Sequence, residues 1–168
     1  MNNNNNKIQD LIDKNEIYEV LVKYCQGVDR CDVDLLKSVY HEDAQDDHGM
    51  FKGKGVDFAE WIIKWEKENL NMGQHVIGNF SCDLQGDVAY CETYCISFSV
   101  DKSGKNATVY NRYIDRFEKR DNCWKIADRL VVLDITRTDE PSDPFGDVPG
   151  WDFTWGRRDK SDPMYKRL

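Results

Sequence analysis

Residues 56–84 read VDFAEWIIKWEKENLNMGQHVIGNFSCDL, and the spacing of the apolar residues changes within this stretch. Up to Leu70 they recur every three or four positions, which predicts an amphipathic helix over about 56–70. After it the period falls to two, the pattern of a half-buried strand that begins near His75. The change predicts helices first and strands afterwards, which is an α+β layout and not a βαβ one.

Two helical segments are predicted before this stretch. Apolar residues at spacings of three and four indicate a first amphipathic helix over 8–27, with Gly27 near its C-terminal end. Asp32 is a suitable N-cap for a second segment. The apolar face of that segment carries Leu35, Leu36, Val39 and Tyr40. The polar residues 45–49 follow.

Four strands are predicted over 75–84, 87–100, 107–119 and 123–137. The turns between them are short and rich in Gly, Asp and Asn, which favours an antiparallel meander. Strands this long coil strongly, so helices across the open side would leave a conical pocket. We therefore expect a cone-shaped α+β barrel, in which N-terminal helices pack on a strongly curved antiparallel sheet.

The length of 168 residues fits one domain with a sizeable core, and no internal repeat is visible. We expect a disordered leader over 1–7, the barrel over 8–138 and a tail over 139–168. The tail is rich in proline, which opposes regular structure. Its aromatic residues are expected to fold over the pocket mouth or a neighbouring subunit, and they are Trp151, Phe153 and Trp155.

The composition limits the possible partners and the compartment. A net charge of -8 disfavours nucleic acid and anionic membrane surfaces as partners. The asparagine run after Met1 is not an apolar signal core, and no apolar run is long enough to span a membrane, so the cytoplasm is the expected location. None of the six cysteines forms a C-x-x-C pair, and buried reduced thiols are expected.

Several short patterns together resemble the SnoaL-like branch of the nuclear transport factor 2-like superfamily, which has a cystatin-like fold. They include Tyr24-x4-Asp29, Asp32-x-Asp34-Leu-Leu36, Tyr40-His-Glu-Asp-Ala44, His75 at the first long strand, and Trp124-Lys-Ile-Ala-Asp-Arg129. The branch includes scytalone dehydratase, bile-acid 7α-dehydratase and lindane dehydrochlorinase. The resemblance implies a homo-oligomer, a trimer in preference to a dimer.

The resemblance also implies the catalytic residues. In the dehydratases and the dehydrochlorinase an Asp at the end of the first helix pairs with a His on the strand, and these positions match Asp29 and His75. Tyr24 matches a Tyr that lies five residues before the Asp of the bile-acid enzyme. Arg129 matches an Arg that lines the pocket from a late strand. The second catalytic His of scytalone dehydratase has no counterpart after His75.

Elementary chemistry supports these assignments and leaves alternatives open. A carboxylate beside an imidazole fixes its tautomer and stabilises its charged form, which suits proton abstraction by His75. Asp29 is unfavourable at the negative end of a helix dipole, although it could simply cap a helix end or form part of a turn. Tyr24 is either a phenol donor or a core aromatic residue. Arg129 either stabilises an oxyanion or pairs with a core carboxylate.

A polar cluster follows the second helical segment, and its spacing matches no defensible zinc or calcium pattern. It comprises His41, Asp43, Asp46, Asp47 and His48. We interpret it as a solvated loop and expect no metal site.

The sequence thus predicts a cofactor-independent lyase of the dehydratase type, or an isomerase. Its substrate would be a hydrophobic, polycyclic or steroid-like, hydroxy or keto compound. No glycine-rich phosphate loop is present, so no cofactor is expected. The alternatives are a polyketide cyclase that uses Asp29 as its base, and a non-catalytic binding or assembly subunit.

Overall fold

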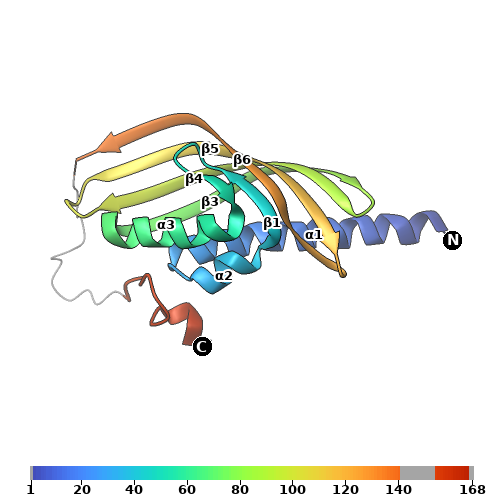
Figure 1. Ribbon diagram of the computed structural model, residues 1–168, viewed down its shortest axis with the longest axis horizontal. Coiled ribbons are helices and arrows are strands. Elements are labelled where there is room, and N and C mark those ends of the chain that lie inside the picture. The colour runs from blue at the N-terminus through green and yellow to red at the C-terminus, as the bar shows by residue number, and fades with distance from the viewer. Residues whose placement is uncertain (1, 141–153, 167–168) are drawn as a thin grey trace.

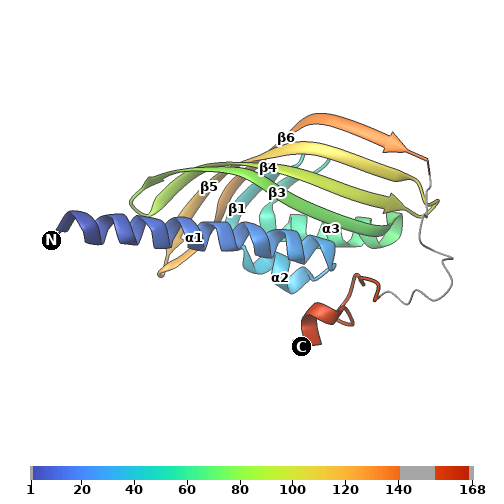
Figure 2. The same cartoon turned by 180° about the vertical axis from the view of Figure 1, so that it is seen from behind.

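A computed structural model describes residues 2–140 and 154–166 of the chain. The elements run in the order α1 (Asn2–Asp29), α2 (Val33–Ser38), β1 (Tyr40–Asp47), β2 (Lys52–Lys54), α3 (Gly55–Asn69), β3 (Leu70–Gln85), β4 (Val88–Asp101), β5 (Asn106–Arg120), β6 (Cys123–Asp139) and the 3₁₀ turn η1 (Pro163–Lys166). Figure 1 shows that one curved sheet lies across the helices, and Figure 2 shows the same layers from behind.

The sheet has six strands in the order β2-β1-β6-β5-β4-β3. The long strands β3 to β6 form the predicted antiparallel meander. The sheet is mixed and open, however, because β1 runs parallel to β6 and the order ends in two free edges, β2 and β3. The predicted α+β fold, with N-terminal helices packed on a strongly curved sheet, is confirmed, and the parallel pairing of β1 with β6 is an addition to the predicted antiparallel meander.

The segment expected to be a solvated loop forms strand β1, and this part of the prediction is wrong. Tyr40, Ala44 and Asp46 point inward and are buried, while Glu42 and Asp43 are exposed. The buried polar groups bind one another, since the Tyr40 hydroxyl donates to Asp46 Oδ2 at 2.7 Å. A strand whose inner face is polar shows little hydrophobic alternation, and its pairing with β6 is too distant in sequence to be predicted locally.

Two element boundaries also differ from the prediction. Helix α1 begins at Asn2, so the expected leader over 1–7 is helical from its second residue. Asparagine is a weak helix former, but extending an existing helix costs much less free energy than nucleating a new one. Strand β3 begins at Leu70, directly after α3, because Leu70 already pairs with Asp101 of β4.

The core lies between the helices and the inner face of the sheet. Its largest fully buried apolar and aromatic side chains include Leu21, Tyr24, Phe58, Tyr113, Phe117 and Ile126. The six cysteines are free, and all except Cys82 and Cys123 are buried. In the tail, Trp155 is 62% exposed, while Trp151 and Phe153 lie outside the described residues. Of the helices within the described residues, none combines the length and apolarity needed to cross a membrane.

Candidate active site

The end of α1 and strand β3 bring Asp29 and His75 together, although they are 46 positions apart in the sequence. The Nδ1 atom of His75 lies 2.6 Å from Asp29 Oδ1, and the backbone N–H of His75 donates to Asp29 Oδ2 at 3.1 Å. Asp29 is buried and His75 is partly exposed. The expected contact is therefore present, and its catalytic role remains a prediction.

This contact determines which ring nitrogen of His75 can react. With a proton on Nδ1 donated to the carboxylate, Nε2 carries the free lone pair. No hydrogen bond to Nε2 is formed by the residues that the structure describes. His75 is one of the residues that line a cavity.

The cavity has a volume of about 550 Å³ and lies between α3 and the inner face of strands β3 to β6. Its apolar lining includes Met50, Trp65, Leu70, Phe98, Val109, Val131 and Leu133. Its polar lining includes His48, Glu66, His75, Ser97, Ser99, Asn111, Tyr113 and Thr136. A mostly apolar cavity with a few convergent polar groups is typical of a small-molecule site.

The structure adds cavity residues that the sequence interpretation missed. Asn111 is buried, and its Oδ1 atom has no hydrogen-bond partner within the described part of the chain. A buried orphan acceptor in a ligand cavity is a natural contact for a substrate hydroxyl. The register of the strands indicates that Asn111 faces the cavity. His75 pairs with Ser97, and Ser97 pairs with Val109. Alternation from that row places Asn111 on the same face.

The side chain of Tyr24 points to a buried network instead of the cavity. Its hydroxyl lies 3.1 Å from His48 Nε2, and His48 Nδ1 binds Asp46 Oδ1. Burial raises the pKa of Tyr24 well above its ordinary value, so the phenol stays protonated. His48 lines the cavity and stacks on Phe58, with 4.0 Å between the ring centroids. Tyr24 thus supports the wall from behind.

Arg129 also lies behind the cavity wall. Its Nε and Nη2 atoms donate to the two oxygens of Asp115 at 2.7 and 2.8 Å, and both side chains are fully buried. The guanidinium lies 4.2 Å from the ring centroids of Tyr24 and Tyr113. Arg129 is not among the lining residues. The structure thus shows the second of the two expected alternatives, pairing with a core carboxylate.

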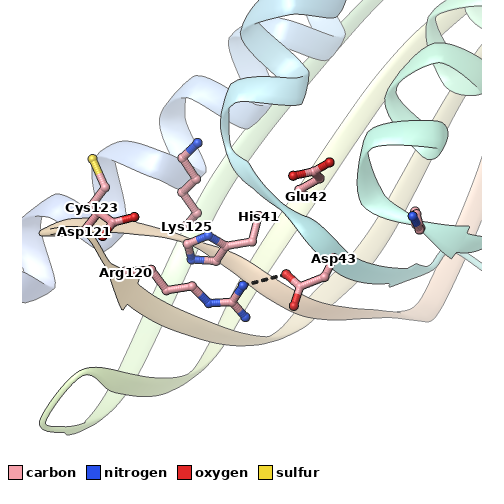
Figure 3. A pocket seen from close by; sticks show the side chains of 8 residues that line it. His41, Glu42, Asp43, Arg120, Asp121, Cys123 and Lys125 are labelled. Carbon is pink, nitrogen blue, oxygen red and sulfur yellow. Dashed lines mark hydrogen bonds and ion pairs between the residues drawn. The ribbon is translucent and has the colours of Figure 1, made fainter.

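A second hollow, of about 590 Å³, lies near the β5–β6 turn and the start of β1. Figure 3 shows its mixed lining, in which Arg120 binds Asp43 and His41 lies between them and Lys125. His41 Nε2 binds the Glu118 carbonyl at 2.9 Å, and burial lowers the pKa of His41. Its charged groups neutralise one another, and it shares no lining residue with the cavity of His75.

Four members of the polar cluster predicted from the sequence are divided between these two places, and the fifth, Asp47, pairs with Lys52. His41 and Asp43 line the second hollow, whereas His48 and Asp46 belong to the network behind the cavity. Within the described residues, no group of three or more His, Cys, Asp or Glu side chains is arranged to hold a metal ion.

Comparison with known proteins agrees with this fold. The SnoaL-like domain matches residues 9–130. Uncharacterized proteins of Mycobacterium tuberculosis and Mycobacterium bovis are 26% identical over 128 residues, which is 73% of this chain and 86% of theirs.

Two solved structures share the fold at low sequence identity. The hexachlorocyclohexane dehydrochlorinase LinA has a TM-score of 0.75 at 18% identity, over 83% of this chain and 99% of that one. A candidate scytalone dehydratase from Novosphingobium aromaticivorans has a TM-score of 0.72 at 17% identity, over 84% of this chain and 99% of that one. Because the family match extends over most of the chain, the protein belongs to the SnoaL-like family.

Proposed function

We propose that the protein is a cofactor-independent dehydratase, or an isomerase, that acts on a hydrophobic hydroxy or keto compound with His75 as the base. One observation carries the proposal: His75 lines an apolar cavity, and Asp29 fixes its ring with Nε2 left free. Two similar structures bear the names of lyases, a dehydrochlorinase and a candidate dehydratase. These names support a lyase-type reaction for this protein, and they do not indicate its substrate.

The proposed reaction begins when His75 Nε2 takes a proton from the carbon next to a carbonyl group. The electron pair of that C–H bond moves toward the carbonyl oxygen, and Asp29 stabilises the imidazolium that forms. In dehydration the electron pair then forms a C=C bond, the C–O bond breaks, and the imidazolium protonates the departing hydroxyl to give water. In isomerisation the same proton returns to a different carbon.

The cavity lining favours an uncharged substrate. Among the described residues that line it, none is Lys or Arg, and Glu66 supplies a carboxyl group. Asn111 and Tyr113 would bind carbonyl or hydroxyl groups, and the apolar residues would contact a polycyclic skeleton. Tyr24 and Arg129, one layer behind, would hold the wall in place.

The test is solvent deuterium exchange, because it detects proton abstraction even when no water is lost. The purified protein is incubated in D₂O with a panel of neutral polycyclic hydroxyketones, with a chelator and without added cofactor. Mass spectrometry follows deuterium uptake at the carbon next to the carbonyl and the loss of water. His75→Gln should lower either rate by about 10²–10⁴-fold.

His41→Gln is the matched control, since His41 lines the second hollow, and it should leave the rates unchanged. Compounds that bind the parent protein without exchange or water loss would overturn the enzyme proposal and favour a binding subunit. Activity that survives in His75→Gln but not in Asp29→Asn would favour a cyclase-like mechanism with Asp29 as the base.

A further inference from the structure

A C-terminal segment beyond the family match docks beside the catalytic pair. Residues 154–166 lie against the end of α1 and the start of α2, as both ribbon views show. Asp32 accepts a hydrogen bond from the Tyr165 hydroxyl at 2.7 Å and forms an ion pair with Lys160. Arg30 and Asp162 form a further ion pair at 3.5 Å. Arg158 precedes these residues in the segment, and its side chain reaches the end of α1.

Arg158 inserts its guanidinium between α1 and α3. Its Nε atom donates to the carbonyl of Asp29 at 3.3 Å, and its Nη2 atom lies 3.5 Å from the carbonyl of Val28. Nη2 also forms an ion pair with Glu66, and both of these side chains are more than nine-tenths buried. Gly73, which lines the cavity, lies next to the guanidinium, because a Cβ atom there would be in van der Waals contact with Nη2 at 3.4 Å.

The charges at this point explain why a buried cation is needed. The last carbonyls of a helix have no helical partners, and they form the negative end of its dipole. The carboxylate of Asp29 adds negative charge there, and Glu66 lines the same cavity as His75. Burial raises the pKa of Glu66, while Arg158 and His75 act in the opposite direction. Without Arg158, nothing in the contacts described would offset these groups except His75 itself.

We propose that Arg158 is a positioning residue for the Asp29–His75 pair. It holds the end of α1 through the Val28 and Asp29 carbonyls, and it engages Glu66 so that this carboxyl group does not compete with Asp29 for His75. This inference extends the proposed function and rests on it, because it takes His75 to be the catalytic base. The protein needs residues beyond the SnoaL-like match to complete its site.

The test is ¹⁵N NMR of the imidazole rings in the full chain without ligand. The chain has only three histidines, so His75→Gln assigns the signals of His75. Ring nitrogen shifts distinguish a protonated nitrogen from a bare one and report the tautomer. Asp29→Asn serves as the reference for a broken pair.

Arg158→Gln should move the His75 signals from the parent position toward those of Asp29→Asn, with the signals of His41 unmoved. Arg157→Gln is the control, since it removes the same charge from the neighbouring exposed residue. A folded Arg158→Gln protein with parental His75 signals would overturn the proposal.

Should Arg158→Gln fail to fold, Arg158→Lys replaces it in the same measurement. Lysine keeps the charge but lacks the planar fork that reaches Glu66 and the helix carbonyls together. Its His75 signals should then lie between those of the parent and of Asp29→Asn, and parental signals would overturn the proposal. The measurement uses no substrate, so its failure is distinct from failure of the proposed reaction.

Discussion

Asp29 holds His75 through both carboxylate oxygens, one on the ring and one on the backbone of the same residue. The ring contact is 2.6 Å and the backbone contact is 3.1 Å. Two contacts fix both the tautomer and the position of the imidazole relative to strand β3. Asp29 itself sits where the helix dipole disfavours a negative charge, so its presence there is better explained by this contact than by helix stability.

The two members of the pair should act as one unit. On a compound that the parent protein converts, we expect Asp29→Asn and His75→Gln each to lower kcat by about 10²–10⁴-fold. The double variant should be only slightly slower than the slower single variant, because removing either member already disables the base. Single-turnover rates measure this. Losses that multiply would show that the residues act independently.

The charge of the ligand should matter more than its size. For a neutral hydroxyketone and its carboxylate counterpart of equal skeleton, we expect at least about tenfold weaker binding of the carboxylate, because a buried charge needs a partner and no Lys or Arg is among the described residues that line the cavity. Quenching of tryptophan fluorescence can report binding, since Trp65 lines the cavity. Equal affinities would contradict an uncharged substrate class.

Asn111 should supply part of that affinity. Asn111→Leu keeps a similar volume but removes the amide, so neutral ligands should bind about 2–10-fold more weakly, the equivalent of one hydrogen bond. Asn79→Leu, at an exposed position of β3, is the control. If both variants bind alike, Asn111 is not a ligand contact.

The sequence predicted the parts of this molecule that depend on local pattern. Apolar periodicity located α3 and the four long strands, and the matched family positions brought Asp29 and His75 together. The sequence could not predict β1, because the inner face of this strand is polar and its partner β6 is distant in sequence. The pairing of Arg129 with Asp115 also depends on register, because the two are cross-strand neighbours of β5 and β6.

The contacts made by the C-terminal segment could not be predicted from the sequence either. Arg158 reaches Glu66 from a segment with little regular structure, and nothing in its local sequence indicates which surface it meets.

The outer face of the sheet predicts self-association. Exposed apolar and aromatic residues gather on β4, β5 and β6, and they include Tyr90, Tyr94, Phe98, Tyr110, Ile114 and Leu130. Contiguous exposed apolar surface marks an interface. Light scattering should give a multiple of 19.7 kDa, with three copies expected in preference to two.

Ile114→Glu should shift the mass toward one copy, because it places a charge within that face. Lys64→Glu, at an exposed position of α3 on the other side of the molecule, should leave the mass unchanged. A parent protein of single-copy mass at micromolar concentration would refute the prediction.

The docking of the C-terminal segment should weaken in acid. The Asp32 carboxylate accepts from the backbone N–H of Leu35 at 3.2 Å and from the Tyr165 hydroxyl at 2.7 Å, and it pairs with Lys160. Burial acts to raise the pKa of Asp32, but these three partners outweigh it, and the pKa lies below its ordinary value. A carboxyl group whose pKa is depressed by folding stabilises the folded state above its unfolded pKa of about 3.9.

That stabilisation is lost as the pH falls through the depressed, folded-state pKa of Asp32. The thermal midpoint of the parent should therefore drop below about pH 4 by more than that of Asp32→Asn, which lacks the titrating group. At neutral pH the same variant should be less stable by on the order of 1 kcal/mol, a discounted value because Lys160 is largely exposed. Asp34→Asn, at an exposed position in the first turn of α2, is the matched control and should follow the parent. Parallel curves for the parent and Asp32→Asn between about pH 2 and 5 would show that Asp32 does not anchor the segment.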